Sequence, residues 1–458
     1  MATARDTIPA ELLCCPRCAG ALEQGPACVC ASCATRYPLI DDIPWLCSEP
    51  DAVLGEWRTR LRALTTELET QSGRYRAALT GELALAATRN RLRLLSSACS
   101  DHARRLQSLL APLGVADASA AAETYRALAA PLPVGQGLTS YYANLHRDWC
   151  WGDAENEAAF RAVGAALGAA NPGRTLVLGA GAGRLAYDIH TRRRPPALIA
   201  ADLNPLMLAV ARRMFAGETV ELYEFPVAPR DLASHAVLRR LKAPAAAPPG
   251  LHLVLADASC PPFAAGEFDT VVTPWLIDIL DEDLVAFAAR VNHWLKPGGR
   301  WVNSGSLFFQ HRDAARCYST EETLVIVQEA GFADVQVHEE VVPYLASPAS
   351  RHARQEGLVT FSAVRHSQPK AVPQGRLLAP PWSARSDVPV PLLPDVSSRV
   401  LAMRVYAFVA SLVDGQRTVR DIADVLVRER LMAADEAEPA VRAFLQRLFD
   451  EAQLPWQP

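Results

Sequence analysis

The sequence lacks long apolar runs and a strong charge of either sign. No apolar run reaches the roughly 18 residues of a membrane-spanning helix, and Met1–Asp6 do not begin a signal-peptide apolar core. The formal net charge is -4, whereas nucleic-acid binding normally uses a clustered basic surface. We therefore expect a cytoplasmic protein that does not insert in a membrane and does not have nucleic acid as its main partner.

Internal repeats and the composition of a disordered chain are also missing. Hydrophobic residues make up 50% and charged residues 21% of the chain, which is a globular balance. Because 458 residues exceed what one hydrophobic core usually organises, we predict several domains. The expected order is a metal ribbon over 1–50, a helical connector over 51–135, an α/β domain over 136–367, a Pro-rich linker over 368–396 and a small helical domain over 397–458.

Short apolar segments alternate with helical patterns in the predicted central domain. Such alternation is typical of a parallel sheet covered by helices on both faces. The fold class is therefore α/β, with a doubly wound, Rossmann-like sheet. The segments expected to be its strands are 175–178, 197–201, 251–255, 268–272 and 300–303.

A glycine-rich loop follows the first of these strands. Gly179, Gly181 and Gly183 are separated by Ala180 and another alanine, and glycine lets a backbone turn sharply and approach a ligand closely. A dinucleotide fingerprint would have its third glycine one position later, where this chain has arginine. The spacing favours S-adenosylmethionine (SAM) over a dinucleotide.

Two acids follow the next two strands. Asp202 is placed to accept hydrogen bonds from ribose hydroxyls, and Asp257 with Ala258 to recognise an adenine amino group. The following strand carries Thr273 to the same rim. In the alternative interpretation, Asp202 and Asp257 only cap the helices that follow. The order of loop, acids and a later Pro-Gly-Gly turn favours the cofactor site.

Residues 140 to 365 resemble the carnosine N-methyltransferase family of class I SAM-dependent methyltransferases. The resemblance rests on the Arg-Asp-Trp that ends Tyr141–Trp149, on Leu276–Ile279 and on Trp301–Leu307. It implies a seven-stranded sheet whose last strand is antiparallel. It also implies that Arg147, the glycine loop and the Arg184 that continues it hold SAM.

The resemblance further implies that Asp278 faces the acceptor nitrogen. An amine or imidazole must present a neutral lone pair to the methyl carbon, and a carboxylate can orient the ring and take up the released proton. We therefore predict Asp278 as the catalytic residue and as a substrate contact. The alternative is that Asp278 only begins the helix expected over 281–295.

The chain departs from the family where the acceptor is bound. The family's substrate-binding histidine is displaced by one place, so that Gln310 stands at its position and His311 follows. With Asn303, these two residues are the candidate substrate contacts. Carnosine itself is therefore not the expected acceptor, and we expect another small molecule or a histidine-containing peptide. The insertion 216–250 is expected to form a lid.

Two CxxC pairs stand near the N-terminus. Cys15, Cys18, Cys30 and Cys33 suit a tetrahedral thiolate zinc site, which would be structural because no coordination position is left open. Cys14 or Cys28 could replace one ligand, and a redox dithiol is an alternative. The segment resembles the zinc ribbon of the small activator subunit of tRNA and release-factor methyltransferases.

The C-terminal segment 413–423 resembles the small winged-helix-like domain that binds precursor peptides in pyrroloquinoline quinone and related peptide-modification pathways. This implies a precursor peptide as partner, whereas a packing or dimerisation role is the alternative. Thr418 is predicted to cap a helix.

Two competing functions remain, an RNA methyltransferase and a non-catalytic SAM-fold scaffold.

Overall fold

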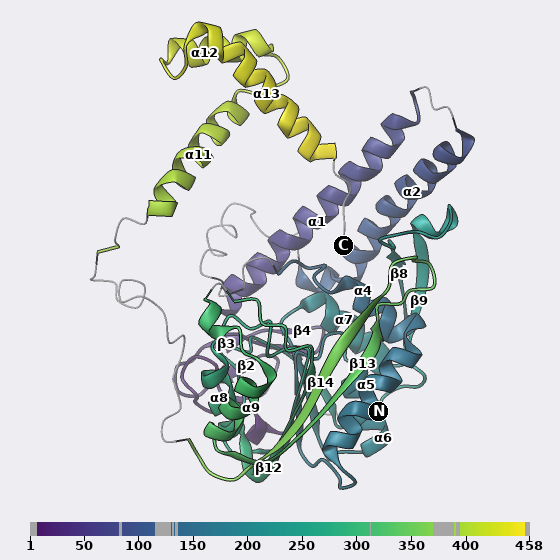
Figure 1. Ribbon diagram of the computed structural model, residues 1–458, viewed down its shortest axis with the longest axis vertical. Helices are drawn as coiled ribbons and strands as arrows, with labels where there is room; N and C mark the ends of the chain where they lie inside the picture. The colour runs from purple at the N-terminus through teal and green to yellow at the C-terminus, as the bar shows by residue number, and fades with distance from the viewer. Residues whose placement is uncertain are drawn as a thin grey trace. The chain divides into compact units, whose positions relative to one another are not determined.

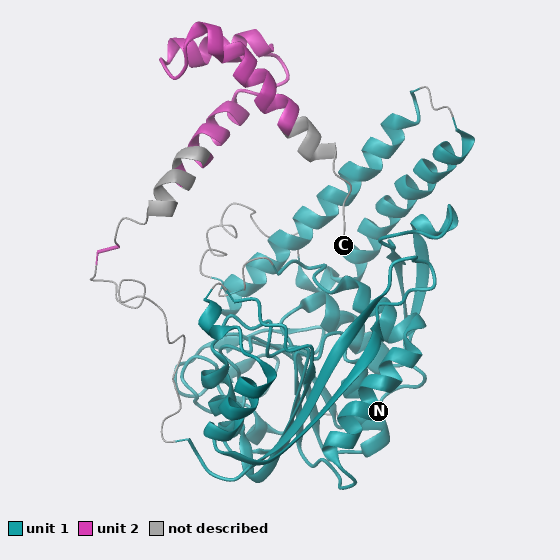
Figure 2. Ribbon diagram, viewed as in Figure 1, with its two compact units in different colours: residues 1–377, 457–458 teal, residues 378–456 magenta. Residues whose placement is uncertain are grey.

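The computed structural model describes residues 7–81, 85–114, 136–311, 313–369 and 394–453, together with residues 130, 132, 389 and 390. It divides into two compact units, residues 1–377 with 457–458 and residues 378–456 (Figure 2). Most of the predicted Pro-rich linker and the last part of the predicted connector lie outside the described residues. The domain boundaries drawn from the sequence remain predictions.

A mixed sheet forms the centre of the larger unit (Figure 1). Its strand order is β13-β14-β12-β11-β6-β7-β10-β5-β4, with β6, β7, β10, β11 and β12 parallel and β14 antiparallel to β12. The predicted α/β fold is confirmed. The strand bounds are β4 Leu39–Ile40, β5 Ile43–Leu46, β6 Thr175–Leu178, β7 Leu198–Asp202, β10 Leu251–Ala256, β11 Phe268–Pro274, β12 Leu295–Gly305, β13 Phe332–Tyr344 and β14 Arg354–Arg365.

The sheet has nine strands, whereas the family resemblance predicted seven. The two additional strands, β4 and β5, come from residues assigned to the N-terminal ribbon. β5 pairs in parallel with β10, so that Trp45 lies beside Leu255 and Leu46 beside Ala256. The ribbon is thus continuous with the edge of the central sheet.

Helices cover this sheet because its parallel strands are apolar on both faces. All four residues of β6 are buried. Local capping sets several helix starts: Asn204 caps α7, Asp283 caps α8 and Ser319 caps α9. The helices are α5 Asp153–Leu167, α6 Arg184–Arg193, α7 Pro205–Phe215, α8 Leu284–Trp294 and α9 Thr320–Glu329, with a short 3-10 turn, η6 Ala314–Arg316, before α9.

The ribbon also covers part of one sheet face. Residues 257–267, between β10 and β11, form no helix, and Leu12 and Leu13 pack into the same core as Phe263 and Trp294. Backbone hydrogen bonds join Cys14 N to Pro262 O (2.9 Å) and Ala264 N to Leu12 O (3.1 Å). The ribbon contains η1 Ala10–Leu12, β1 Leu22–Glu23, β2 Cys28–Cys30 and β3 Arg36–Tyr37, the three strands forming an antiparallel sheet.

The predicted helical connector contains an antiparallel pair of long helices, α1 Pro50–Ala78 and α2 Ala86–Leu109, followed by the turn η2 Ala111–Leu113. The predicted insertion forms a two-stranded antiparallel sheet, β8 Thr219–Glu224 and β9 Val237–Lys242, with the turn η5 Ala233–His235 between them. This hairpin packs against α2, where Arg105 pairs with Glu221 at 3.1 Å. Whether it acts as a lid remains a prediction.

In its described residues, the smaller unit has the helices α11 Pro394–Ser411, α12 Val419–Arg428 and α13 Ala434–Gln453. The predicted cap is confirmed, because Thr418 and Asp421 form a capping box at the start of α12. Residues 394–453 contain no strand, so the wing implied by the sequence resemblance is absent from this described part. In the parts of the chain that the structure describes, no helix has the length and apolar character needed to cross a membrane.

Candidate functional site

The glycine loop lies at the carboxyl end of β6 and leads into α6. Gly179, Gly181 and Gly183 have φ values of 75°, 55° and 80°, in the left-handed region that favours glycine. A Cβ on Gly183 would lie 2.7 Å from Phe215 Cζ, whereas a Cβ on Gly181 would meet no atom within 4 Å. The loop therefore needs glycine for packing at position 183 and faces open space at position 181.

Asp202 at the end of β7 holds this loop in place. Its Oδ2 accepts a hydrogen bond from Gly181 N (2.8 Å), and its Oδ1 accepts one from Asn204 N (2.8 Å). Burial raises the pKa of Asp202, and the N–H groups of Asn204, Gly181 and Leu203 act in the opposite direction. Because Asn204 is the cap of α7, the interpretation of Asp202 as a helix cap is wrong.

Asp257 follows β10 at the same rim. Its Oδ1 accepts a hydrogen bond from Ser259 N at 2.8 Å, while its buried Oδ2 has no hydrogen-bond partner among the described residues. An unsatisfied buried acceptor is unfavourable, and no helix begins after Asp257 for it to cap. With the open loop at Gly181, this unpaired oxygen fits a nucleoside whose amino group would donate to it.

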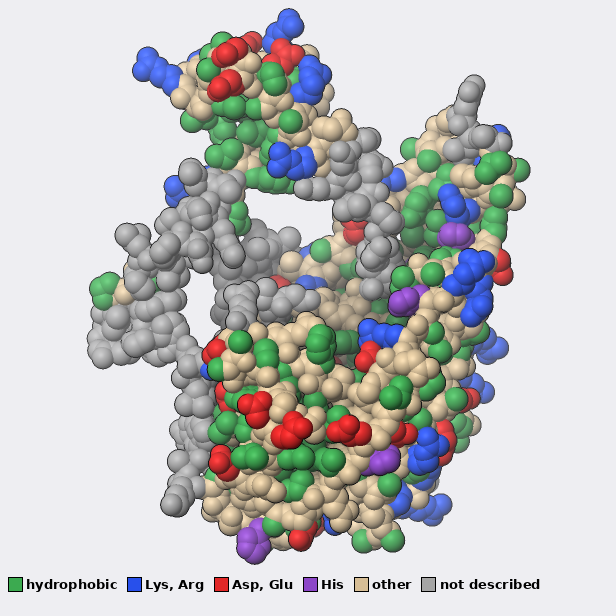
Figure 3. Space-filling view, viewed as in Figure 1, with side chains coloured by type: hydrophobic (Ala, Val, Ile, Leu, Met, Phe, Trp, Pro, Cys, Tyr) green, Lys and Arg blue, Asp and Glu red, His purple; other side chains and the backbone are tan. Residues whose placement is uncertain are grey.

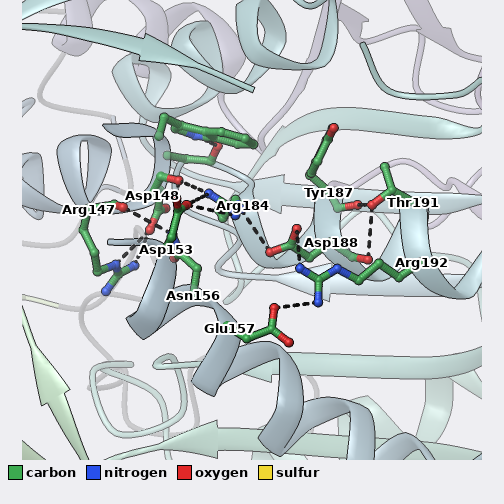
Figure 4. Close-up of polar contacts among 12 residues, drawn as sticks. Arg147, Asp148, Asp153, Asn156, Glu157, Arg184, Tyr187, Asp188, Thr191 and Arg192 are labelled. Carbon is green, nitrogen blue, oxygen red and sulfur yellow. Dashed lines mark hydrogen bonds and ion pairs between the residues drawn. The ribbon is translucent and has the colours of Figure 1, made fainter. Parts of the chain in front are cut away.

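The segment before the sheet is docked on the glycine loop (Figure 4). A short helix, α4 Tyr142–His146, continues into a π-helical turn, η4 Arg147–Trp151, in which Gly152 N donates to Arg147 O at 2.8 Å. The indole of Trp149 donates to Ala182 O at 2.9 Å. π-Helical turns occur frequently at functional sites, and this one brings Arg147 to the rim of the sheet.

The two arginines predicted to hold the cofactor differ in their surroundings. Arg184 donates to Asp148 O (2.6 Å) and to Asp188 Oδ2 (3.0 Å), so it joins α6 to the preceding segment. Arg147 pairs with Asp148 at 2.7 Å and lies 5.4 Å from the ring centroid of Tyr344. Cofactor contacts by either arginine remain predictions.

Four residues other than glycine have left-handed backbone conformations at this rim. They are Tyr141, Trp275, Leu307 and Leu345, with φ values of 63°, 50°, 50° and 55°. Residues in such conformations cluster at functional sites, where the surrounding fold holds them. Trp275 and Leu345 directly follow β11 and β13, and Leu307 is the second residue after β12.

Tyr141 was missed as a candidate site residue, although it lies in a segment that carried the family resemblance. Burial raises the pKa of its phenol, and Tyr344, Asp278 and Asp202 raise the pKa further. The signal in the sequence was only the aromatic character of the segment.

Asp278 lies in the wall of a cavity of about 330 Å³. Its Oδ2 accepts hydrogen bonds from Ser306 Oγ and Phe308 N, both at 2.8 Å, and the residue is 8% exposed. The cap of α8 is Asp283, so Asp278 does not start that helix. The cavity is lined by Asp278, Ile279, Leu280, Asp281, Glu282, Leu284, Ser306, Phe308, Phe309, Gln310, His311, Arg316 and Tyr318.

The structure thus brings Asp278, Gln310 and His311 together, as expected for acceptor contacts, but places Asn303 elsewhere. Asn303 and Thr273 are buried between β12 and β11, and their side chains bond to each other at 2.9 Å. The indole of Trp301 also donates to Thr273 Oγ1 at 2.9 Å. Neither residue lines the cavity, and their ligand contacts remain predictions.

The four predicted cysteine ligands form one cluster in the ribbon. The sulfurs of Cys15, Cys18, Cys30 and Cys33 all lie within 4.8 Å of one another. Two of the separations are 3.7 Å (Cys15 to Cys33) and 3.5 Å (Cys18 to Cys30), close to the roughly 3.8 Å edge of a tetrahedron with Zn–S bonds of about 2.3 Å. Cys14 and Cys28 are outside this cluster.

The parallel sheet, the glycine loop and the two acids beyond it define a class I SAM-dependent methyltransferase. The sequence profile described as "Carnosine N-methyltransferase" matches residues 136–367, which is half of the chain. The chain belongs to this family. A search of curated proteins finds no match.

Solved methyltransferase structures resemble the chain only distantly. Phosphoethanolamine N-methyltransferase 2 of Haemonchus contortus is 16% identical over 47% of this chain and 53% of its own, with a TM-score of 0.32. This chain therefore spans about half the length of that protein. A chain in the complex between the Haloferax volcanii Trm112 methyltransferase activator and a methyltransferase is 14% identical over 50% of this chain and 96% of its own, with a TM-score of 0.34. The N-methyltransferase NodS of Bradyrhizobium japonicum is 15% identical over 46% of this chain and 97% of its own, with a TM-score of 0.29.

Proposed function

We propose that the protein transfers the methyl group of SAM to an imidazole or amine nitrogen of a small molecule or of a histidine-containing peptide. The observation that carries this proposal is the position of Asp278, a buried carboxylate in the wall of a cavity at the rim that also carries Asp202 and Asp257. Family membership supports a nitrogen acceptor.

The hydrogen bonds of Asp278 suit this role. Ser306 and Phe308 hold Oδ2, whereas no described residue donates a hydrogen bond to Oδ1. Oδ1 would accept the N–H of an imidazole or amine, fix the direction of the lone pair and receive the released proton. SAM, when bound, supplies the electrophilic methyl group, and the glycine loop, Asp202 and Asp257 would hold its nucleoside.

The charge distribution favours a small acceptor over RNA. On the face of the larger unit that Figure 3 shows, Lys and Arg side chains lie along the right-hand side, over α2, the β8–β9 hairpin and the helices below them, whereas Asp and Glu side chains lie across β13, β14 and α9; the C-terminal helices carry charges of both signs. RNA binding normally needs a continuous basic surface.

We also propose that the cysteine cluster binds a structural zinc ion and that residues 397–458 deliver a peptide acceptor.

Mass spectrometry of methyl transfer would test the proposed activity. The full chain would be incubated with SAM and a panel of imidazole compounds, histidine-containing peptides and total RNA. We expect a mass increase of one methyl group on a nitrogen of an imidazole or amine. Methylation of RNA alone would contradict the proposal. If the protein did not bind SAM at all, the alternative of a non-catalytic SAM-fold scaffold would be supported.

A further inference from the structure

The connection between β13 and β14, residues 345–353, lies at the rim that carries the cofactor and acceptor residues. β12 and β13 are both antiparallel to β14, so they run in the same direction and end at the same edge of the sheet. Leu345, the first residue of this connection, has a left-handed backbone with a φ of 55°, which persists only where the surrounding structure holds it. Contacts from α5, from Tyr344 and from the insertion hold this connection in place.

Glu155, in the first turn of α5, contributes the contact from the helix. Its two carboxylate oxygens accept hydrogen bonds from Leu345 N at 3.0 Å and from Ala346 N at 2.9 Å. Hydrogen bonds from N–H groups to a carboxylate are roughly twice as strong as those between neutral groups. One side chain therefore joins the start of α5 to a segment that follows it by 190 residues in the sequence.

The ring of Tyr344, directly before the connection, contacts the segment that is expected to hold the cofactor. The guanidinium carbons of Arg147 and Arg354 lie 5.4 and 4.7 Å from its centroid, and the ring of Trp275 lies 5.0 Å away. A guanidinium within about 6 Å of an aromatic ring face is attracted by it. The position of Arg147 is therefore coupled to that of Tyr344 and of the connection that follows it.

The insertion is fastened to the other side of the same connection. Arg230 N donates a hydrogen bond to Ala349 O at 3.1 Å, and Arg351 N donates one to Ala228 O at 2.7 Å. The Arg351 guanidinium donates to Pro229 O at 2.9 Å and to Arg230 O. The insertion that the sequence predicts as a lid thus moves with residues 345–353 or loses these hydrogen bonds.

We infer that Glu155 is a positioning residue through which cofactor binding at Arg147 orders the connection 345–353 and, with it, the insertion. The inference rests on the proposed contact between Arg147 and the cofactor and needs no particular acceptor. A ligand shifts such an equilibrium only by binding one state more tightly than the other. A cofactor that fixes Arg147 favours the state in which Tyr344 lies against it and Glu155 holds the residues that follow. The predicted lid then closes in response to SAM rather than to the acceptor.

Hydrogen–deuterium exchange of the full chain, with and without saturating S-adenosylhomocysteine, would test this inference. The reporters are the amides of Leu345 and Ala346, which donate to Glu155, and those of Arg230 and Arg351, which join the connection to the insertion. In the wild type, the ligand is expected to slow exchange of all four amides about tenfold or more, as for one stabilised hydrogen bond to a charged group. No slowing in the wild type would overturn the inference.

Glu155→Gln would locate the effect. Glutamine presents one oxygen and one amide group, so only one of the two N–H groups keeps its acceptor. The slowing caused by S-adenosylhomocysteine should then be largely lost at Arg230 and Arg351, which Glu155 does not contact. A merely structural role of Glu155 would speed exchange equally with and without the ligand and would preserve the difference. An unchanged difference at these two amides would therefore contradict the inference.

Glu157→Gln is the matched control. Glu157 lies two residues further along α5, is exposed, and pairs with Arg192 at 2.7 Å (Figure 4). The substitution removes the same charge from the same helix but none of the contacts to the connection, so the exchange difference should equal that of the wild type. An equal loss in Glu155→Gln and Glu157→Gln would show a general charge effect and would overturn the assignment to Glu155.

Tyr344→Leu tests the same route from its other end. Leucine keeps apolar bulk and leaves the two hydrogen bonds of Glu155 in place, but it removes the ring beside Arg147. The slowing by S-adenosylhomocysteine at Arg230 and Arg351 should again be lost. Thermal unfolding of both variants would show whether each is folded, and if Glu155→Gln is not, Tyr344→Leu decides. A folded Tyr344→Leu protein with the full difference would overturn the inference.

The exchange experiment uses no methyl acceptor, so its outcome is independent of the proposed nitrogen methylation. A Glu155-dependent exchange difference in a protein that methylates only RNA would uphold the inference and contradict the proposed function. Methylation of an imidazole by a protein whose exchange difference survives Glu155→Gln would uphold the proposed function and overturn the inference.

Discussion

Trp45 of the N-terminal ribbon lies beside Leu255 of the central sheet, as its partner in the parallel strands β5 and β10. Two residues after Leu255, the chain reaches Asp257, whose unpaired Oδ2 is at the cofactor rim. The Cys47 thiol, just after β5, is also close to Asp257: burial first, and this carboxylate next, raise its pKa. The ribbon therefore packs directly against the segment that carries Asp257, the residue proposed to bind the cofactor.

Metal removal should consequently weaken cofactor binding. We expect the double variant Cys18→Ser/Cys33→Ser to lose the proposed zinc ion and to unfold at a lower temperature. The reason is that coordination of the metal by four thiolates supplies much of the folding free energy of such a module. S-adenosylhomocysteine affinity should fall about tenfold or more, equivalent to about 1.4 kcal/mol. Elemental analysis, thermal unfolding and calorimetry would measure these changes. Cys150→Ser, an exposed cysteine outside the cluster, should change none of them.

Asp257→Asn should separate cofactor binding from stability. Asparagine keeps an oxygen that accepts the hydrogen bond from Ser259 N. It removes the negative charge of the carboxylate and replaces Oδ2, which has no hydrogen-bond partner among the described residues, with an amide nitrogen. We expect SAM affinity to fall about tenfold to a hundredfold, the range for losing a hydrogen bond to a charged group. The free protein should unfold at the same temperature or slightly higher. Unchanged SAM affinity by calorimetry would show that Asp257 does not bind the cofactor.

Asp278→Asn should affect the chemical step and not cofactor binding. The amide keeps the side-chain size but cannot take up a proton, so kcat is expected to fall about 10²- to 10⁴-fold. Single-turnover kinetics with a substrate found in the panel would measure the loss. SAM affinity, measured in parallel, should stay the same. A variant with normal kcat would exclude Asp278 as the catalytic residue.

Gly152→Ala should displace Arg147. The added Cβ would lie 2.4 Å from Arg147 O and 2.5 Å from Arg147 Cγ, so the π-helical turn would have to open. We expect a lower thermal midpoint and weaker SAM binding. Gly164→Ala in α5 is the matched control, since its Cβ meets only Phe160 Cε1 at 3.9 Å. That change should stabilise the helix by about 1 kcal/mol.

Two buried histidines should make stability depend on pH. His102 and His146 are fully buried, and the ring of each meets the ring of Tyr142 edge to face, with centroids 5.5 and 5.1 Å from it. Burial lowers the pKa of each from 6.5 to about 3. Between these values the unfolded chain binds more protons, so each histidine lowers the free energy of unfolding as pH falls, by about 1.4 kcal/mol per pH unit.

Urea unfolding at pH 7, 6 and 5 would measure this dependence. His146→Phe should reduce the slope between pH 6.5 and 5, because one titrating group is removed while the aromatic packing is kept. His338→Gln, at an exposed position of β13, should leave the slope unchanged. The same slope in His146→Phe would show that this histidine is not buried in its neutral form.

Local patterns in the sequence were sufficient for several features. The five parallel strands lie within a few residues of the apolar segments that predicted them, because burial on both faces leaves a continuous apolar run. The cysteine cluster followed from the CxxC spacing, since ligand geometry limits that spacing. The glycine loop and the two acids followed from their order along the chain.

Non-local pairing decided the rest. Strand β5 is only Ile43–Leu46, and so short a segment carries no local signal that its partner is β10, more than 200 residues later. The side chains of Thr273 and Asn303 form a buried hydrogen bond with each other. Arg184 donates hydrogen bonds to the Asp148 carbonyl and to the Asp188 carboxylate. The sequence by itself determined the fold class, the cofactor loop and the cysteine cluster, because these depend on local periodicity and spacing. Only the tertiary structure decided which polar side chains satisfy one another and which face the cavity, because that depends on contacts between distant segments.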